Sequence, residues 1–209
     1  MRLTKGRVLA VVVVAALPLA WWLRGDSYPI INADVGAGPI IAFGDSLTAG
    51  FAVDRDGAYP QQLAGLLGTP VINRGLSGDT TEGGLARLQH DVLDDDPGIV
   101  LLCLGANDFL RRLDEDRAFA NFETIIERIQ QRGALVILIG LDFPLNRSYA
   151  RRYRELARRK GCPFVPDVMD GILGDRDLMT DQVHPNAGGY KLWAQRVERV
   201  LRPYVRGPN

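Results

Sequence analysis

A serine and an aspartate–histidine pair are the residues of this chain whose types and spacing suit covalent catalysis. Ser46 lies in Gly44-Asp45-Ser46-Leu47, directly after the apolar run Ile40–Phe43. That position is typical of a side chain held at the carboxyl end of a buried strand, where open α/β sheets bind ligands. Gly-Asp-Ser is also a common turn composition, so the motif depends on partners elsewhere in the chain.

A nucleophilic serine requires a base and a group that orients the base. The chain has two histidines, and His184 follows Asp181 by three residues in Asp-Gln-Val-His-Pro. Across a turn the carboxylate can hold the imidazole, which leaves the second ring nitrogen for Ser46. An Asp-x-x-His pair also occurs as a capping or structural pair. His90 lies within a helical pattern, where a polar surface position is expected.

Two further segments offer hydrogen-bond donors to the same site. The strand expected at Val71–Asn73 leads into a loop containing Gly78, which can present backbone N–H groups to a ligand or can serve ordinary turn chemistry. The run Ile99–Leu104 leads into Gly-Ala-Asn-Asp, where the Asn107 amide can donate to an oxyanion or stabilise a turn. Four separate connections therefore supply a nucleophile, a backbone donor, an amide donor and an acid–base pair.

The elements that would position these residues alternate between apolar strands and amphipathic helices. This alternation predicts an α/β fold, a three-layer α/β/α sandwich whose five-stranded parallel sheet has the flavodoxin-like order 2-1-3-4-5. The expected strands are Ile40–Phe43, Val71–Asn73, Ile99–Leu104, Leu135–Ile139 and Pro163–Val168. The expected helices are Ala58–Leu67, Thr80–Leu93, Asp114–Gln131, Ser148–Lys160 and Asn186–Leu201.

These blocks resemble, in the right order over about Ile40 to Tyr204, the four sequence blocks of the SGNH hydrolases, also called GDSL esterases. The stretches GDSLTAG, AYP and NRGLSGDTTEGGLARL look most like the bacterial thioesterase I/lysophospholipase and arylesterase branch. The resemblance implies that Ser46 is the nucleophile, His184 the general base and acid, and Asp181 its orienter. It also implies an oxyanion hole made by the backbone N–H groups of Ser46 and Gly78 and the side chain of Asn107.

The expected function is a serine esterase that hydrolyses carboxylic esters or thioesters through an acyl-serine. Aryl esters, short acyl esters and lysophospholipids are the expected substrates, with no metal or organic cofactor. One alternative is an O-deacetylase of envelope glycans, which uses the same chemistry on a polar substrate. A second alternative is an inactive, membrane-tethered binding module. The Gly-x-Ser-x-Gly elbow of the larger α/β-hydrolase family is absent around Ser46.

The connection between Pro144 and Pro163 affords a short loop and one helix, less than related thioesterases carry, which predicts a more open cleft. Its helix has a basic face that would be solvated, or would contact anionic lipid headgroups if the domain were tethered to a membrane. The arginines of this face are Arg151, Arg152, Arg154, Arg158 and Arg159.

Composition limits the other functional classes. The 209 residues carry 25 basic and 25 acidic side chains, and a net charge of zero argues against a nucleic-acid partner. Cys103 and Cys162 lie in or beside apolar runs and are expected to be small buried hydrophobes, although a disulfide is compatible with an oxidising compartment.

The amino-terminal segment is expected to direct the chain out of the cytoplasm. Basic residues precede an apolar run from Val8 to Leu23, which favours an uncleaved anchor over a cleaved signal peptide or a buried helix. Residues 1–23 are thus an anchor or signal, 24–38 a linker and 39–205 the hydrolase domain. An anchored domain would face the periplasm or another extracytoplasmic space, and a cleaved one would be secreted or periplasmic.

Overall fold

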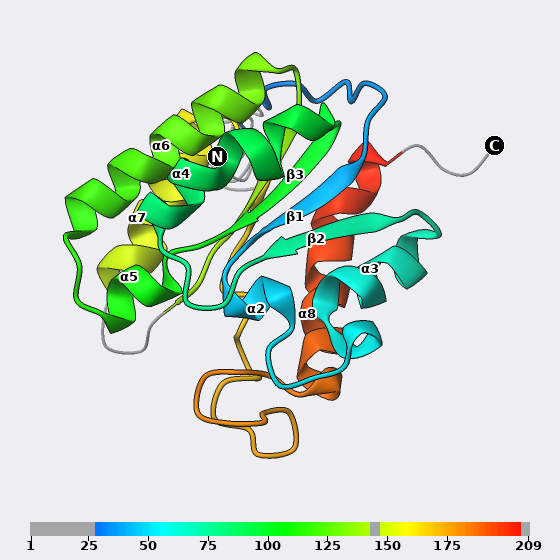
Figure 1. The fold of residues 1–209 in the computed structure, drawn as a ribbon, viewed down its shortest axis with the longest axis vertical. Coiled ribbons are helices and arrows are strands. Elements are labelled where there is room, and N and C mark those ends of the chain that lie inside the picture. The colour runs from blue at the N-terminus through cyan, green and yellow to red at the C-terminus, as the bar shows by residue number, and fades with distance from the viewer. Residues whose placement is uncertain (1–27, 143–146, 206–209) are drawn as a thin grey trace, which may run out of the picture.

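The computed structural model of this chain describes residues 28–142 and 147–205. They form a parallel sheet in the order β2-β1-β3-β4-β5, which confirms the predicted fold class and strand order (Figure 1). The strands are β1 (Ile40–Gly44), β2 (Val71–Gly75), β3 (Ile99–Cys103), β4 (Leu135–Ile139) and β5 (Phe164–Val165).

Helices cover both faces of the sheet. Helices α3 and α8 pack together on one face, and α4 and α6, followed by α7, cover the other (Figure 1). The α-helices are α2 (Ser46–Ala49), α3 (Tyr59–Leu67), α4 (Thr81–Asp91), α5 (Ala106–Leu110), α6 (Glu115–Gln131), α7 (Arg147–Arg159) and α8 (Ala187–Leu201). The 3-10 helices are η1 (Arg55–Gly57), η2 (Leu93–Asp95) and η3 (Arg202–Tyr204).

The structure differs from the expected elements in the length of the edge strand β5 and in two short helices at the carboxyl ends of β1 and β3. Strand β5 has two residues instead of six, because Pro163 and Pro166 flank it and neither can donate a ladder hydrogen bond. Two short helices that the hydrophobic pattern did not predict, α2 and α5, begin just beyond β1 and β3. Both carry residues of the candidate site.

The core lies on both sides of the three central strands. Every residue of β1, β3 and β4 is buried, as expected for continuous apolar strands covered on both faces. Cys103 and Cys162 are free thiols inside this core, so they act as buried hydrophobic groups. Burial raises the pKa of the Cys162 thiol to about 12, which keeps it protonated and unreactive at neutral pH.

Part of the basic face of α7 is paired with carboxylates of α6. The guanidinium of Arg152 lies 2.7 Å from the Asp116 carboxylate and 3.3 Å from that of Glu115. Just beyond the helix, the Lys160 ammonium lies 2.6 Å from the Glu127 carboxylate and 3.3 Å from that of Glu123. Part of this charge is therefore paired within the domain, which leaves less of it for anionic lipid headgroups.

The segment from residue 28 to residue 38, expected to belong to a linker, lies along the amino-terminal edge of the sheet (blue in Figure 1). The Tyr28 hydroxyl donates to the Cys162 carbonyl at 2.7 Å, and the Asn32 amide donates to the carbonyls of Gln130 and Ala134. Only residues 24–27 of that linker, and the expected anchor at 1–23, lie outside the described residues. Within residues 28–142 and 147–205, no helix is long and apolar enough to span a bilayer.

Candidate active site

Ser46 is placed at the sheet edge by an abrupt change from strand to helix. Strand β1 ends at Gly44, and α2 begins at Ser46 with Asp45 as its N-cap, whose carboxylate accepts the Leu47 N–H at 3.0 Å. A Cβ on Gly44 would lie 2.2 Å from the Cys103 carbonyl and from the Thr48 hydroxyl. Glycine is therefore required for the turn that presents the serine.

His184 and Asp181 are held by a tight loop ahead of α8. The Asp181 carboxylate accepts the backbone N–H groups of Val183 and His184, both at 2.8 Å. The loop is closed by a hydrogen bond of 2.9 Å from the Thr180 N–H to the His184 carbonyl. These backbone hydrogen bonds thus fix the Asp181 carboxylate independently of its contact with the imidazole.

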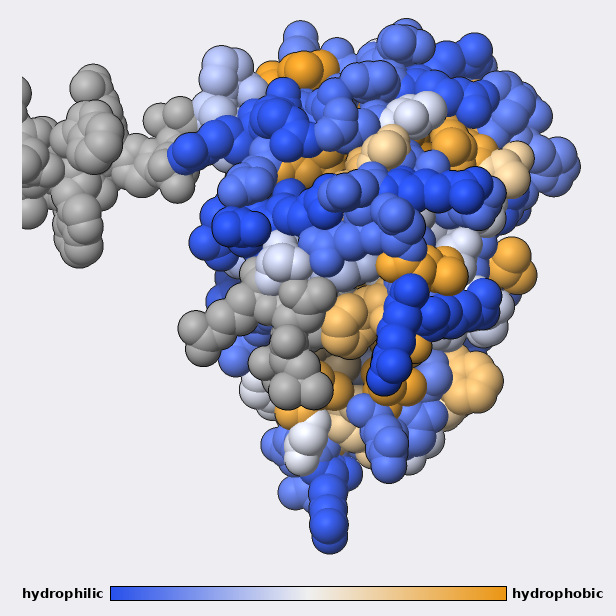
Figure 2. Space-filling view, turned by 90° about the vertical axis from the view of Figure 1, so that its left-hand side faces the viewer, coloured by the Kyte–Doolittle hydropathy of each residue, from blue (hydrophilic) through white to orange (hydrophobic). Residues whose placement is uncertain are grey.

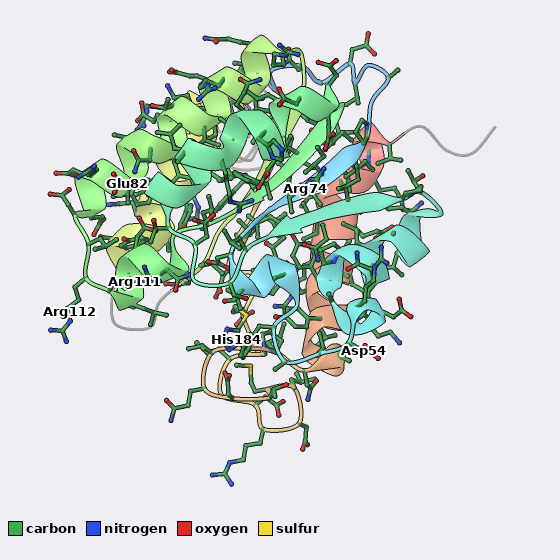
Figure 3. The ribbon with its side chains drawn as sticks, viewed as in Figure 1. Asp54, Arg74, Glu82, Arg111, Arg112 and His184 are labelled. Atoms are coloured by element: carbon green, nitrogen blue, oxygen red, sulfur yellow. The ribbon has the colours of Figure 1, made fainter. Side chains whose placement is uncertain are left out.

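A continuous chain of hydrogen bonds links the three side chains at the carboxyl ends of the strands, where Figure 3 shows His184. His184 Nδ1 lies 2.8 Å from Asp181 Oδ2, and Nε2 lies 3.0 Å from Ser46 Oγ. Because a carboxylate only accepts, Nδ1 carries the proton and Nε2 is left as an acceptor for the serine hydroxyl. This is the tautomer that general-base catalysis requires.

The charge of Asp181 is secured by its hydrogen bonds. The backbone N–H of Val183, with the His184 imidazole and backbone N–H, lowers the pKa of the Asp181 carboxyl to about 2, against the opposing effect of desolvation. Asp181 therefore stays ionised at any pH at which the enzyme would work. Its side chain is 43% exposed, so we assign it orientation of the imidazole rather than a large stabilising energy.

Gly78 and Asn107 line the same pocket as Ser46. Gly78 has a φ of +80°, a left-handed conformation that glycine adopts without strain. Its carbonyl accepts a hydrogen bond of 2.7 Å from Arg111, and the Asn107 amide donates to the Asp79 carbonyl at 2.9 Å. An amide has two N–H groups, so one anchors the loop and the second remains for a ligand.

Helix α5 is tied to the start of α4 by a buried aspartate. The Asp108 carboxylate accepts the Thr81 N–H at 2.9 Å and the Thr81 hydroxyl at 2.6 Å. This pairing satisfies a carboxylate that is almost completely buried. It also couples the segment that carries Asn107 to the loop that carries Gly78.

The pocket beside these residues has a volume of about 300 Å³ and an apolar lining. Figure 2 shows hydrophobic side chains gathered in the lower half of one face, below a hydrophilic region. Phe51 lies against the candidate base, with 4.5 Å between its ring centroid and that of His184. The apolar side chains that line the pocket are Leu47, Phe51, Ala106, Leu110, Leu141, Met169, Leu173 and Val183.

Asp45 is a buried acid for which the sequence pattern predicted no special role. Its side chain has no exposed surface, and Oδ2 has no hydrogen-bond partner among the described residues. Burial raises the pKa of the Asp45 carboxyl to about 7. The only signal in the sequence is an acidic residue between an apolar strand and the serine, and N-capping of α2 accounts for such a residue equally well.

All the site residues expected from the sequence, Ser46, Gly78, Asn107, Asp181 and His184, border one pocket or contact its lining. His90 is exposed on α4 and bonded to Asp91, away from the pocket. Among residues 28–142 and 147–205, no group of three or more histidine, cysteine, aspartate or glutamate side chains is arranged to hold a metal ion.

The chain is similar in sequence and in structure to known proteins. The model of the GDSL-like lipase/acylhydrolase family matches residues 42–192. Esterase TesA of Pseudomonas aeruginosa is 27% identical over 188 residues, which cover 84% of this chain and 94% of that protein. Thioesterase 1/protease 1/lysophospholipase L1 of Escherichia coli is 31% identical over 180 residues, covering 81% and 86%. A crystal structure of TesA superimposes with a TM-score of 0.75 at 27% identity, covering 80% of this chain and 99% of the other.

Because the pKa of the buried Asp45 carboxyl is raised, we expect the stability of the protein to depend on pH. Between the ordinary pKa of 3.8 and the value of about 7 in the fold, the folded protein binds more protons at this site than the unfolded chain. The free energy of unfolding contributed by this group therefore falls as the pH rises through that window. The Asp45→Asn side chain can still accept the Leu47 N–H but does not ionise. We therefore expect the unfolding free energy of this variant to lack the part of the decline with rising pH that Asp45 causes.

Urea denaturation of both proteins at about pH 5 and about pH 8 measures the effect, because other titrating groups cancel in the comparison. The difference in unfolding free energy between variant and wild type should shift in favour of the variant at the higher pH. Parallel changes in the two proteins would show that Asp45 ionises normally.

Proposed function

The chain belongs to the GDSL-like lipase/acylhydrolase family and is a serine ester hydrolase, and we propose that its acyl-enzyme forms on Ser46, with His184 and Asp181 as base and orienter. The observation that carries this proposal is the unbroken chain from Asp181 Oδ2 through the imidazole to Ser46 Oγ, with steps of 2.8 and 3.0 Å. Both distances lie within the range for proton transfer.

In the first half-reaction, Ser46 Oγ attacks the carbonyl carbon of an ester or thioester while His184 Nε2 accepts its proton. The carbonyl π electrons move to oxygen and form a tetrahedral oxyanion. When the oxyanion collapses, the bond to the alcohol or thiol breaks and His184 returns the proton to that leaving group. Water then repeats these steps on the acyl-serine and releases the carboxylic acid.

The oxyanion would be stabilised by the backbone N–H groups of Ser46 and Gly78 and by the second amide N–H of Asn107. Preorganised donors of this kind act where negative charge develops, and each lowers the activation barrier by about 2.7–4 kcal/mol. The hydrogen bonds from Arg111 to the Gly78 carbonyl and from Asn107 to the Asp79 carbonyl support this role, because they hold the loop that presents the donor.

Among esters and thioesters, we propose aryl esters, short acyl esters and lysophospholipids as substrates. An apolar pocket of about 300 Å³ at the nucleophile suits an acyl or aryl group, since its surface is removed from water on binding. Envelope glycan O-deacetylation is the second candidate, because the same chemistry would act on an acetyl group. The apolar lining beside Ser46 favours the first.

We further propose that the domain is exported and held at the inner membrane by residues 1–23, facing the periplasm or another extracytoplasmic space. The chain from Tyr28 onward is bound to the amino edge of the sheet, whereas Ser46 lies beyond the carboxyl edge. Residues 24–27 span at most about 13 Å when fully extended. In this arrangement the pocket would open away from the anchoring bilayer, so substrate would arrive from the aqueous side.

Asn107→Ala should lower kcat about 100-fold or more with a preserved fold, because it removes one donor to the oxyanion. Turnover of a p-nitrophenyl ester, with a thermal melt as the control for folding, checks this. An unchanged kcat would remove Asn107 from the oxyanion hole.

A panel of p-nitrophenyl esters of increasing acyl length, beside a lysophospholipid and acetylated glycans, tests the substrate class. We expect kcat/KM to be higher for the esters and to rise with acyl length until the pocket is filled. Ser46→Ala is the control for background hydrolysis. Faster deacetylation of a glycan than hydrolysis of any ester would support the second candidate instead.

The full chain in proteoliposomes tests the tether. The protein should remain with the vesicles after alkaline extraction and retain its amino terminus by mass spectrometry. A soluble product that has lost the apolar run would show a cleaved signal. For the retained protein, lysophospholipid in separate vesicles should be hydrolysed at least as fast as the same lipid in the enzyme's own bilayer. A clear preference for lipid in its own bilayer would contradict the orientation.

A further inference from the structure

Arg87 is a nearly buried cation beneath the site. It lies on α4, and its side chain is 15% exposed. The guanidinium stacks 4.2 Å from the centre of the Phe43 ring. Its N–H groups are directed at four acceptors: Nε donates to Asp79 Oδ2 at 2.7 Å, Nη1 to the Arg74 carbonyl at 2.9 Å and to Asp91 Oδ2 at 2.8 Å, and Nη2 to the Gly44 carbonyl at 2.9 Å.

Two of these acceptors adjoin the two backbone donors assigned to the oxyanion hole. Gly44 is the last residue of β1, two positions before Ser46. Asp79 directly follows Gly78. The Gly44 carbonyl also accepts the Leu76 N–H at 3.0 Å, so this oxygen is shared by Arg87 and the start of the loop. One guanidinium therefore spans the serine turn and the oxyanion loop.

Asp79 accepts hydrogen bonds from two side chains that hold that loop. Its carboxylate is bound by Arg87, and its carbonyl accepts the Asn107 amide at 2.9 Å. The side chain of Asp79 is 5% exposed, so its pairing with Arg87 is only weakly screened by solvent. The peptide after Gly78 is consequently held from both sides.

We propose that Arg87 is a positioning residue, whose guanidinium sets the distance between the Ser46 and Gly78 backbone N–H groups. This inference rests on the proposed acyl-serine mechanism. Oxyanion donors act only when they lie about 2.7–3.1 Å from the developing charge. A planar, rigid fork suits that task because it fixes several acceptors relative to one another, whereas a lysine ammonium is a single point charge on a flexible stem.

The alternative role for Arg87 is to fasten α4 to the sheet without influence on catalysis. Asp91 separates the two roles, because it is a partner of the same guanidinium but lies on α4 itself, four residues along the helix. Losing the Asp79 bond releases the loop, while losing the Asp91 bond releases only a contact within the helix. Asp79→Asn and Asp91→Asn are thus a matched pair.

We expect Arg87→Lys and Asp79→Asn to lower kcat on a p-nitrophenyl ester by between about 10-fold and 100-fold, with KM nearly unchanged. Asp91→Asn should keep the wild-type kcat. End-point labelling with a fluorophosphonate counts folded sites in each preparation. If Arg87→Lys does not fold, the two aspartate variants decide the question. Wild-type protein that is not labelled would refute the mechanism itself, independently of Arg87.

A double-mutant cycle with Asn107→Ala measures the coupling between the two residues in kcat, which distinguishes a positioning role of Arg87 from a purely structural one. If Arg87 acts through the oxyanion loop, the loss in kcat of Arg87→Lys/Asn107→Ala should be smaller than the product of the two single losses. Multiplicative losses would overturn the proposal. So would a wild-type kcat in both Arg87→Lys and Asp79→Asn, or an equal loss in Asp91→Asn.

Discussion

The hydrogen bond between His184 Nε2 and Ser46 Oγ joins residues 138 positions apart in the chain, and the chemistry depends on its length of 3.0 Å. No local structure can hold such a contact. It is maintained because β1 lies near the middle of a fully buried sheet and delivers the serine to its carboxyl edge, while α8 anchors the loop that carries the imidazole. The rigidity of the packed sheet therefore sets the catalytic geometry.

Polar groups beneath the carboxyl edge of the sheet also hold that geometry, and each is hydrogen-bonded to the backbone.

 The Asp45 carboxylate caps α2, Asp108 binds the first turn of α4, and Arg87 binds the carbonyl that ends β1. Such groups are costly to bury unless their hydrogen bonds are satisfied, so their partners restrict the backbone to one arrangement. The exception is Asp45 Oδ2, which has no hydrogen-bond partner among the described residues, and burial raises the pKa of this acid.

Much of the fold could be predicted from the sequence because its strongest signals are apolar and periodic. Continuous apolar runs such as Ile99–Leu104 and Leu135–Ile139 are typical of strands in a sheet that is covered on both faces. Helices α2 and α5, with four and five residues, are too short to show a helical period, and they follow from N-caps and strand ends instead. Pro163 and Pro166 limit β5 to two residues. The sequence alone does not show this effect, because it depends on how β5 pairs with β4.

The candidate site was predictable to the extent that its chemistry needs scarce residues. With two histidines in the chain, the pairing of His184 with Asp181 narrowed the choice of base. Arg87 could not be identified in this way, because the chain is rich in arginine and only the tertiary structure shows which guanidinium reaches the Gly44 carbonyl. The buried state of Asp45 was equally hidden, since desolvation is a property of the packed domain.

The most direct test of the account is to locate the covalent adduct formed by a fluorophosphonate. Mass spectrometry of the labelled, digested protein should place a single adduct on Ser46, and Ser46→Ala should remain unlabelled under the same conditions. An adduct on another residue, or undiminished labelling of Ser46→Ala, would contradict the assignment of Ser46 as the nucleophile.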